Sequence, residues 1–332
     1  MSESRTIPLG DTAQAVFGPL HRHVAQIQEA FRDPNAPRGS PAYRLTFDAQ
    51  GDKLIIKSGA GASEADFVRA QRIVEALIDQ ARRKGRVREG EVLAAISFSE
   101  GVSADAPATM QLPQLGGLTL RTPRQVHYVE ALRDENIDLI FGVGPAGTGK
   151  TFLAVAAAVE ALKQERVDKI IVTRPAVEAG EKLGYLPGDL AEKVDPYLQP
   201  IWDAFRSQMS EGDLKARRER RQIEVAPLAF MRGRTLSNAF VIVDEAQNAT
   251  VLQMKMTLTR LGEGSRMVVT GDPSQIDLLR PDQSGLAHAI SILEDVPAVE
   301  IIRFAVQDVV RHRLVAHIVE AYQRDDSARG GG

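Results

Sequence analysis

Residues 144–151 read Gly-Pro-Ala-Gly-Thr-Gly-Lys-Thr and match the phosphate-binding pattern G-x-x-x-x-G-K-[ST]. The apolar run 137–143 in front of them predicts a buried strand, and the Ala-, Leu- and Val-rich run 152–162 behind them predicts a helix. Glycines let the backbone N–H groups surround an anion, and the N-terminus of the helix adds its partial positive charge. A plain glycine-rich turn does not require the Lys-Thr pair, so we interpret the segment as a nucleotide-binding loop.

This loop predicts ATP and Mg²⁺ as ligands and gives roles to single residues. Lys150 is expected between the β- and γ-phosphates, and the Thr151 hydroxyl is an expected Mg²⁺ ligand. Upstream, near the start of a predicted helix, Gln125 has an amide that matches the adenine edge. The expected nucleotide contacts are Gly144, Pro145, Ala146, Gly147, Thr148, Gly149, Lys150, Thr151 and Gln125.

Two carboxylates, Asp244 and Glu245, directly follow the apolar run 240–243. Asp244 is the expected partner of Mg²⁺, through a metal-bound water or through the Thr151 hydroxyl. Glu245 is the candidate general base for the attacking water. The alternative is a pair of solvated acids after an edge strand, but two acids at the end of a buried strand are costly without a cation.

A third polar cluster follows the apolar run 267–270. We predict that Gln275 senses the γ-phosphate, because its amide can donate to a phosphate oxygen and accept from the attacking water. Asp272 can instead cap the turn that follows the strand. The expected catalytic residues are therefore Glu245, Lys150 and Gln275.

One arginine is also expected to offset the charge that develops at the γ-phosphate. Each of the available arginines could equally be a solvated surface residue. The candidates are Arg174, Arg232, Arg234 and Arg311.

Apolar, strand-like runs alternate with helical patterns through the second part of the chain. The expected strands are 137–143, 169–173, 223–226, 240–243, 267–270 and 299–303. This alternation predicts an α/β domain with a mainly parallel sheet, helices on both faces and ligands at the C-terminal ends of the strands. We expect this domain to span residues 122–324, with a disordered tail at 325–332.

The first part of the chain, residues 1–100, predicts a small α+β domain that begins with a disordered stretch, 1–10. Gly51-Asp52 between two alternating runs predicts a hairpin, and residues 64–82 predict an amphipathic helix. The basic cluster at 82–88 suits either the C-terminus of this helix or the phosphates of an RNA. Residues 101–121 have no clear period and predict a linker, with a short strand at 118–120.

Composition limits the possible partners and chemistry. The net charge of the 332 residues is -3, so nucleic acid would have to be held by local basic patches. The absence of cysteine excludes disulfides, zinc thiolates and cysteine catalysis. The sequence has no apolar stretch of signal-peptide or membrane-spanning length, so we expect a cytoplasmic protein with no membrane partner.

Five segments of the chain together resemble the PhoH family. They are Gly-Pro-Ala-Gly-Thr-Gly-Lys-Thr (144–151), Arg-Pro-Ala-Val-Glu-Ala-Gly-Glu-Lys-Leu-Gly (174–184), Met-Arg-Gly-Arg-Thr-Leu (231–236), Asp-Glu-Ala-Gln-Asn (244–248) and Thr-Gly-Asp-Pro-Ser-Gln-Ile-Asp (270–277). This resemblance covers about residues 119–322 and implies a RecA-like P-loop NTPase related to the first motor domain of superfamily-one helicases. It also implies that the strand before Gln275 lies between the strands that precede the phosphate loop and Asp244.

The N-terminal part resembles the small domain of full-length bacterial members of the family, which is similar to a KH fold and implies nucleic-acid binding. The same resemblance implies oligomeric rings and a functional association with an endoribonuclease that processes ribosomal RNA. A helicase closes two motor domains around one nucleotide, and this chain has room for one. We therefore expect a homo-oligomer, such as a hexamer, with ATP at the subunit boundary.

From these residues we expect a Mg²⁺-dependent ATPase coupled to RNA, either a helicase or a remodelling factor in RNA metabolism and ribosomal-RNA maturation. The alternative is a nucleotide-switched adapter that recruits an endoribonuclease without unwinding RNA. A small-molecule kinase is disfavoured, because a kinase needs no water-activating acid beside the metal-binding aspartate.

Overall fold

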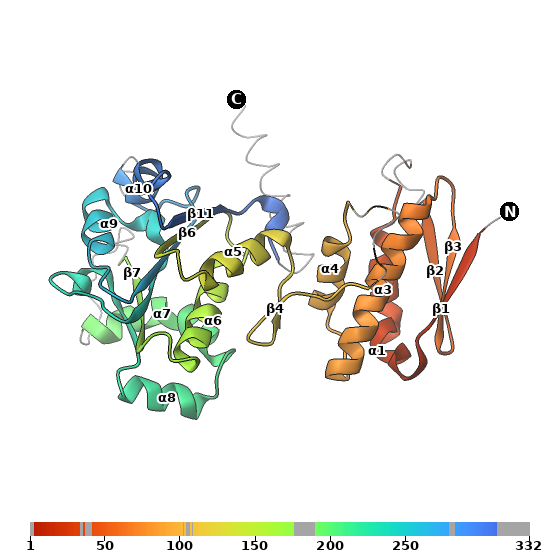
Figure 1. Cartoon of the computed structure of the whole chain (residues 1–332), viewed down its shortest axis with the longest axis horizontal. Helices are drawn as coiled ribbons and strands as arrows, with labels where there is room; N and C mark the ends of the chain where they lie inside the picture. Colours follow the sequence, from red (N-terminus) through yellow and green to blue (C-terminus); the bar gives the residue numbers. More distant parts are fainter. Residues whose placement is uncertain are drawn as a thin grey trace. The chain divides into compact units, whose positions relative to one another are not determined.

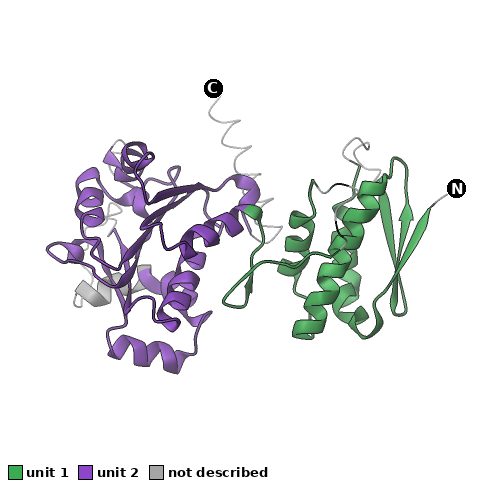
Figure 2. Cartoon of the chain, viewed as in Figure 1, with its two compact units in different colours: residues 1–123 green, residues 124–332 purple. Residues whose placement is uncertain are grey.

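The structure is a computed structural model that describes residues 3–33, 42–101, 109–175, 190–278 and 283–310, together with residues 36, 103 and 107; side chains at 190–197 lie outside this description. The chain divides into two compact units, Met1–Pro123 (unit 1) and Arg124–Gly332 (unit 2) (Figure 2). Within the described ranges, no helix combines the length and the apolar character that crossing a bilayer would require.

Unit 1 is an α+β unit built on a small antiparallel sheet. Its strands pair in the order β1-β3-β2, and a capping box at Ser63 begins the long helix α3. The elements are β1 (Ser4–Pro8), α1 (Ala13–Phe17), α2 (Arg22–Glu29), β2 (Leu45–Gln50), β3 (Lys53–Ser58), α3 (Glu64–Lys84), α4 (Glu89–Phe98), β4 (Gln114–Leu115) and β5 (Leu118–Thr119). The predicted hairpin and amphipathic helix are both present.

The expectation that residues 1–10 are disordered is wrong for the described part. Strand β1 pairs with β3 from Ser4, opposite Lys57, to Pro8, opposite Lys53. Ile7 and Leu9 are buried in the core of unit 1. The backbone pairing of an edge strand leaves little trace in composition, which is why a polar stretch with two apolar residues gave no signal.

The segment predicted as a linker, 101–121, lies within unit 1. It contains the short hairpin β4–β5, and Leu112 belongs to the core of unit 1. Leu115 and Leu120 are also buried. Single leucines among polar residues have no periodicity, so their burial could not be predicted from the pattern.

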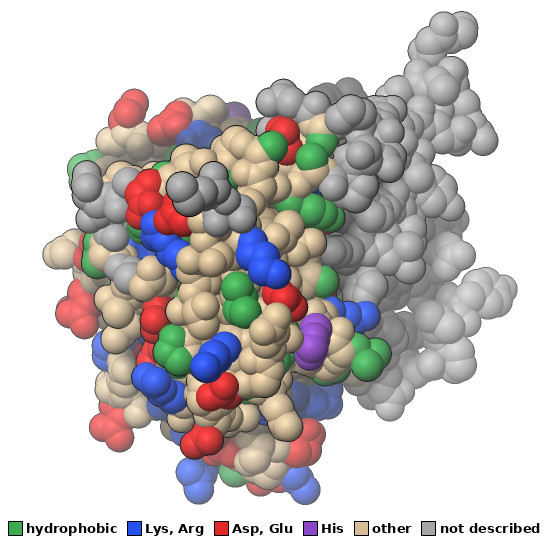
Figure 3. Space-filling model, turned by 90° about the vertical axis from the view of Figure 1, so that its right-hand side faces the viewer, with side chains coloured by type: hydrophobic (Ala, Val, Ile, Leu, Met, Phe, Trp, Pro, Cys, Tyr) green, Lys and Arg blue, Asp and Glu red, His purple; other side chains and the backbone are tan. Residues whose placement is uncertain are grey.

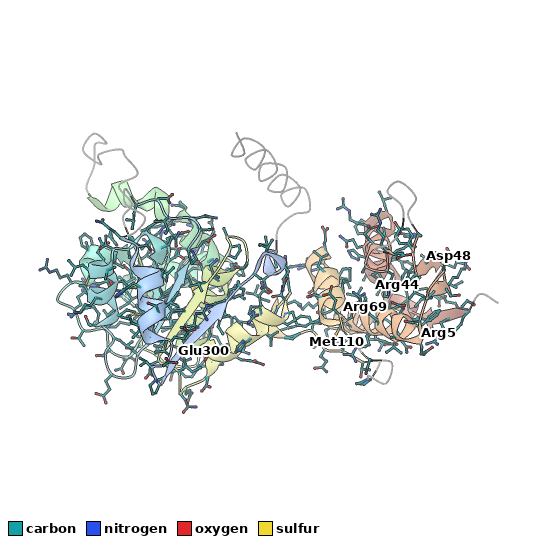
Figure 4. All side chains as sticks on the ribbon, turned by 90° about the horizontal axis from the view of Figure 1, so that it is seen from above. Arg5, Arg44, Asp48, Arg69, Met110 and Glu300 are labelled. Carbon is teal, nitrogen blue, oxygen red and sulfur yellow. The ribbon has the colours of Figure 1, made fainter. Side chains whose placement is uncertain are left out.

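Several arginines of unit 1 are engaged in its structure (Figure 4). Arg44 pairs with the buried Asp66 at 3.1 Å. The Arg69 guanidinium lies 5.1 Å from the centre of the Phe31 ring and donates to the Ser99 hydroxyl at 3.1 Å. Burial lowers the pKa of Arg69. These cations stabilise the fold and are not free to hold a polyanion.

Unit 2 contains a sheet of six strands that all pair in parallel, in the order β11-β6-β10-β9-β7-β8. The strands are β6 (Leu139–Val143), β7 (Lys169–Arg174), β8 (Ile223–Pro227), β9 (Ala239–Val243), β10 (Arg266–Gly271) and β11 (Val299–Arg303). The helices are α5 (Pro123–Arg133), α6 (Lys150–Lys163), α7 (Leu190–Arg206), α8 (Glu211–Glu219), α9 (Val251–Leu258) and α10 (Gly285–Leu293), with short 3₁₀ turns η4 (Leu228–Met231), η5 (Ala246–Asn248) and η7 (Val306–Asp308). Each predicted strand is present.

Helices cover both faces of this sheet (Figure 1). Strand side chains such as Phe141 and Val243 form one core with Met254 of α9 and Leu286 of α10. On the opposite face α6 packs against β7, β9 and β10, and Tyr128 of α5 lies against Gly142 of β6. The predicted α/β P-loop NTPase fold is therefore confirmed.

The strand order brings the polar clusters together. Strand β10 lies between β6 and β9, in the position that the family resemblance implies. Because neighbouring parallel strands end at the same edge of the sheet, the phosphate loop after β6, Asp244 after β9 and Asp272 after β10 meet there.

Tyr128, on the face of the sheet that α5 and α6 cover, is a polar residue in an unusual environment. It is fully buried, and its ring meets the Phe304 ring edge to face at 5.4 Å. Among the described residues, its hydroxyl has no hydrogen-bond partner. Burial raises the pKa of Tyr128, and the charge of Asp244 adds to this effect.

We predict that Tyr128→Phe stabilises the protein by about 1 kcal/mol, because it removes a buried polar group that makes no hydrogen bond. Thermal unfolding should show a midpoint a few degrees above that of the wild type. The matched control is Tyr43→Phe, which should lower stability because the Tyr43 hydroxyl donates to Glu29 at 3.1 Å. A destabilised Tyr128→Phe would show that the hydroxyl is held by an ordered water.

Candidate active site

The phosphate loop has the backbone conformation that its glycines allow. Gly144, Gly147 and Gly149 have φ values of 135°, 86° and 86°, which favour glycine. A Cβ atom on Gly144 would collide with the carbonyl oxygen of Phe304, after β11. The Val310 N–H donates to the Gly147 carbonyl at 2.9 Å. The loop is thus braced by the chain that follows the last strand.

Lys150 lies over its own loop. Its ammonium donates to the carbonyl oxygens of Gly144 at 2.6 Å and Pro145 at 2.8 Å. The Thr148 hydroxyl donates to the same Pro145 carbonyl at 3.1 Å. The cation is therefore placed where backbone N–H groups of such loops surround phosphate oxygens.

The Asp244 carboxylate accepts hydrogen bonds from two hydroxyl groups. The hydroxyls of Thr151 and Thr270 donate to its Oδ1 atom at 2.6 and 2.7 Å. Mg²⁺ in nucleotide sites is held by one or two protein oxygens together with phosphates and waters. The Thr151 hydroxyl beside the Asp244 carboxylate fits that requirement, because both groups offer oxygen ligands at the edge of the phosphate loop.

A cleft of about 370 Å³ opens at this edge of the sheet. The predicted site residues that line it are Ala146, Gly147, Gly149, Lys150, Thr151, Arg174, Asp244, Glu245 and Gln275. The structure thus brings together side chains from four different strand ends, and their roles in ATP hydrolysis stay predictions.

Glu245 is held in an uncommon conformation in this cleft. Its φ is 52°, in the left-handed region, and its side chain is 37% exposed. One carboxylate oxygen lies 3.6 Å from the Arg174 guanidinium, and the other accepts from the Gln247 amide at 2.6 Å. Strained backbone at such a position costs on the order of 1 kcal/mol or more and is characteristic of functional sites.

The Asp272 carboxylate stabilises the loop that contains Gln275. One of its oxygens accepts from the Ser274 N–H at 3.0 Å, which is the capping role considered above. The other accepts from the Ala146 N–H of the phosphate loop at 3.1 Å. The segment that presents Gln275 is thus joined directly to the phosphate loop.

Gln125 is placed differently from its predicted role at adenine. The residue is buried, and its amide donates to the Thr148 carbonyl at 3.0 Å. This contact braces the phosphate loop from α5. A contact with adenine stays a prediction.

The four candidate arginines fall into different environments. Arg174 lines the cleft. Arg234 makes two hydrogen bonds to Glu224, at 2.6 and 2.8 Å, and Arg232 is exposed nearby. Arg311 lies outside the described residues, as do residues 176–184 of the motif segment 174–184. Arg174 is therefore the candidate that the described geometry favours for the γ-phosphate.

Sequence reasoning gave no role to three residues that the structure places at the site. Thr270 donates to Asp244, as described above. Gln247 and Asn248 hold the segment after β10: the Asp272 N–H donates to Gln247 at 3.0 Å, and the Asp277 N–H donates to Asn248 at 2.8 Å. The available signal was two amides that follow Asp244 and Glu245 after one alanine, and the chemistry of a single amide does not distinguish such a residue from a solvent-exposed one.

The chain is similar to several known proteins. Residues 117–323 match the family described as PhoH-like protein. The chain is 47% identical over 288 residues to a PhoH-like protein of Bacillus subtilis, covering 85% of this chain and 88% of that one. It is 48% identical over 272 residues to a PhoH-like protein of Mycobacterium bovis, covering 80% and 77%. A solved Sulfolobus solfataricus SWI2/SNF2 ATPase core in complex with dsDNA is similar with a TM-score of 0.36 and 17% identity, covering 59% of this chain and 47% of that one.

We predict that the Arg234–Glu224 pair stabilises the fold in a pH-dependent way. The hydrogen bonds from Arg234 lower the pKa of Glu224, so their stabilisation is present above the ordinary pKa of a glutamate and is lost as the pH falls through the lowered value. Arg234→Gln should therefore cost up to about 1 kcal/mol near neutral pH, since both groups are partly exposed.

Urea unfolding near neutral pH and at about pH 3 measures this difference. The wild type and Arg234→Gln should differ more at the higher pH than at the lower one. A difference of the same size in acid would show that Arg234 acts through packing rather than through its charge.

Proposed function

The chain belongs to the PhoH-like protein family, and from this premise we propose that it is a Mg²⁺-dependent ATPase coupled to RNA. The observation that carries the proposal is the cleft in which Lys150 meets Asp244 and Glu245, which come from two distant parts of the chain. Such a set holds a nucleoside triphosphate, its metal ion and the water that attacks the γ-phosphate.

Each residue of the cleft has its own role in hydrolysis. The loop N–H groups and Lys150 bind the phosphates, and the Thr151 hydroxyl with Asp244 holds Mg²⁺. When bound, Mg²⁺ neutralises charge on the β- and γ-phosphate oxygens. Glu245 accepts a proton from the attacking water, and Gln275 orients that water against the γ-phosphate. Arg174 offsets the charge that develops in the transition state.

We expect Lys150→Ala and Glu245→Gln to lower ATP hydrolysis for different reasons. Lys150→Ala removes a phosphate contact, so ATP affinity and turnover should both fall. Glu245→Gln removes the proton acceptor and should lower kcat by about 10² to 10⁴ fold with ATP affinity retained. Phosphate release and binding of a fluorescent ATP analogue measure the two effects.

Lys163→Ala is the matched control for the lysine variant. Lys163 ends the same helix, and its ammonium donates to the Gln208 carbonyl at the surface. This variant should hydrolyse ATP as the wild type does. Full activity in Glu245→Gln would contradict the assignment of the base.

A basic turn in unit 1, residues 82–88, supports RNA as the partner. Arg82 and Arg86 are exposed around Gly85, which ends α3 in the left-handed conformation. Their neighbours Arg83 and Lys84 pair with acidic side chains. Figure 3 shows acidic and basic side chains interspersed on the face of unit 1 that it presents. The two exposed arginines make the basic turn a candidate for phosphate contacts.

We predict that Arg82→Glu with Arg86→Glu weakens RNA binding at every sequence and reduces its salt dependence. Loss of two phosphate contacts should lower the slope of log K against log salt by about 1.4 for single-stranded RNA. Fluorescence anisotropy at several salt concentrations measures it. The control is Lys53→Glu with Lys57→Glu, which changes the charge equally on the sheet of unit 1. Equal loss in both double variants would show non-specific attraction.

A nucleotide-switched adapter that recruits an endoribonuclease is the second candidate, because it would use the same cleft. Strand separation distinguishes the two. A helicase or remodelling factor in ribosomal-RNA maturation should separate an RNA duplex, and Lys150→Ala and Glu245→Gln should both stop it. ATP hydrolysis without separation would favour the adapter.

We also propose that the chain acts in the cytoplasm as a homo-oligomeric ring with ATP near the subunit boundary. Phe152, a cleft residue that is 36% exposed, and Val306, which is 77% exposed, support a contact surface at this edge. Arg232 is the exposed arginine that a neighbouring copy could present. Light scattering that finds a fully active monomer would contradict this proposal.

A further inference from the structure

Gln247 is a buried side chain at the rim of the active site with no role in the proposal above. It lies in η5, directly after Asp244 and Glu245, and is 1% exposed. Its Oε1 atom accepts from the Asp272 N–H at 3.0 Å, and its Nε2 atom donates to Glu245 Oε2 at 2.6 Å. The amide thus connects the end of β9 with the end of β10.

The chemistry of the partners fixes the orientation of this amide. A backbone N–H can only donate, so the atom facing Asp272 must be the oxygen. The nitrogen is then left facing the Glu245 carboxylate, which needs a donor. A glutamine is the residue that meets both requirements at this distance, because it carries one acceptor and one donor on a planar group.

The packing around Gln247 leaves it little freedom. A Cβ atom on Gly271 would lie 2.8 Å from its Oε1 atom, so a larger residue there would displace the amide. On the other side, the Ser284 hydroxyl donates to the Gln247 carbonyl at 2.8 Å. The side chain is therefore fixed relative to the sheet by contacts with two neighbouring elements.

Through Asp272, this amide reaches the segment that carries Gln275. The segment is held at one end by Gln247 and at the other by Asn248, which accepts from the Asp277 N–H at 2.8 Å. Asp272 also accepts from the Ala146 N–H. The position of Gln275 relative to the phosphate loop therefore depends on these contacts.

We propose that Gln247 is a positioning residue for hydrolysis, which sets the carboxylate of Glu245 and the segment of Gln275 in one fixed relation. The inference rests on the proposed ATPase function. One contact is with Glu245 itself and the other is with the backbone N–H of Asp272, which begins the segment of Gln275; neither is with Lys150 or Thr151. Loss of Gln247 therefore lowers turnover while ATP binding stays the same.

Two variants test this assignment. Gln247→Met has nearly the same volume and loses both contacts, whereas Gln247→Glu keeps the acceptor for Asp272 and loses the donor for Glu245. Both should lower kcat by about 10 to 100 fold, with the KM for ATP and the affinity for a fluorescent ATP analogue changed less than about 3 fold. If Gln247→Met does not fold, as judged by thermal unfolding, Gln247→Glu still gives the answer.

The control for the amide is Gln253→Met, in the capping box of α9 and away from the cleft, which should leave kcat unchanged. The decisive measurement repeats Gln247→Met in the Glu245→Gln background, in single turnovers with enzyme in excess. A residue that acts through Glu245 causes little further loss there, whereas a merely structural residue causes the same loss in both backgrounds.

The outcomes separate this inference from the proposed function. A wild-type chain that binds ATP without hydrolysing it would overturn both. Normal hydrolysis by the wild type, with kcat retained in Gln247→Met or Gln247→Glu, would overturn the positioning role alone. Equal losses in the two backgrounds, or a loss confined to ATP affinity, would overturn it as well.

Discussion

The carboxylate of Asp244 is the point on which the active site depends. It is buried at the end of β9 and accepts one hydrogen bond from the Thr151 hydroxyl of α6 and one from the Thr270 hydroxyl of β10. A buried charge without such donors would be costly, so the hydrogen bonds and the fold require each other. They can form only if β10 lies next to β9 and if α6 packs against both strands. The pairing of these strands and the position of one acid are thus one constraint.

Much of unit 2 could be predicted from its sequence. Buried parallel strands are continuous apolar runs, and each run stands out between helical patterns. The polar residues that follow 137–143, 240–243 and 267–270 mark the ends of these strands, and ends of parallel strands share an edge. The order of the strands in the sheet does not follow from periodicity. The family resemblance implied only that the strand before Gln275 lies between the other two, and the pairing of β10 with β6 and β9 confirms this.

The features that could not be predicted depend on contacts between distant residues. Strand β1 is stabilised by backbone pairing with β3, and the segment 101–121 by single leucines in a core, and neither leaves a pattern. Arg234 was a candidate for the γ-phosphate on sequence alone, and only the structure shows its hydrogen bonds to Glu224. Gln247 is informative only through its two partners, since an isolated amide has no preferred function. Sequence chemistry identifies groups that react, whereas the groups that hold them are identified by geometry.

The brace on the phosphate loop has a consequence for how the protein is made. The loop contacts Phe304 and Val310, which follow β11, the last strand of the sheet, and β11 pairs directly with β6. A chain still on the ribosome has synthesised its glycine loop long before these residues emerge from the exit tunnel. The brace on the phosphate loop can therefore form only after residues 304–310 have left the exit tunnel.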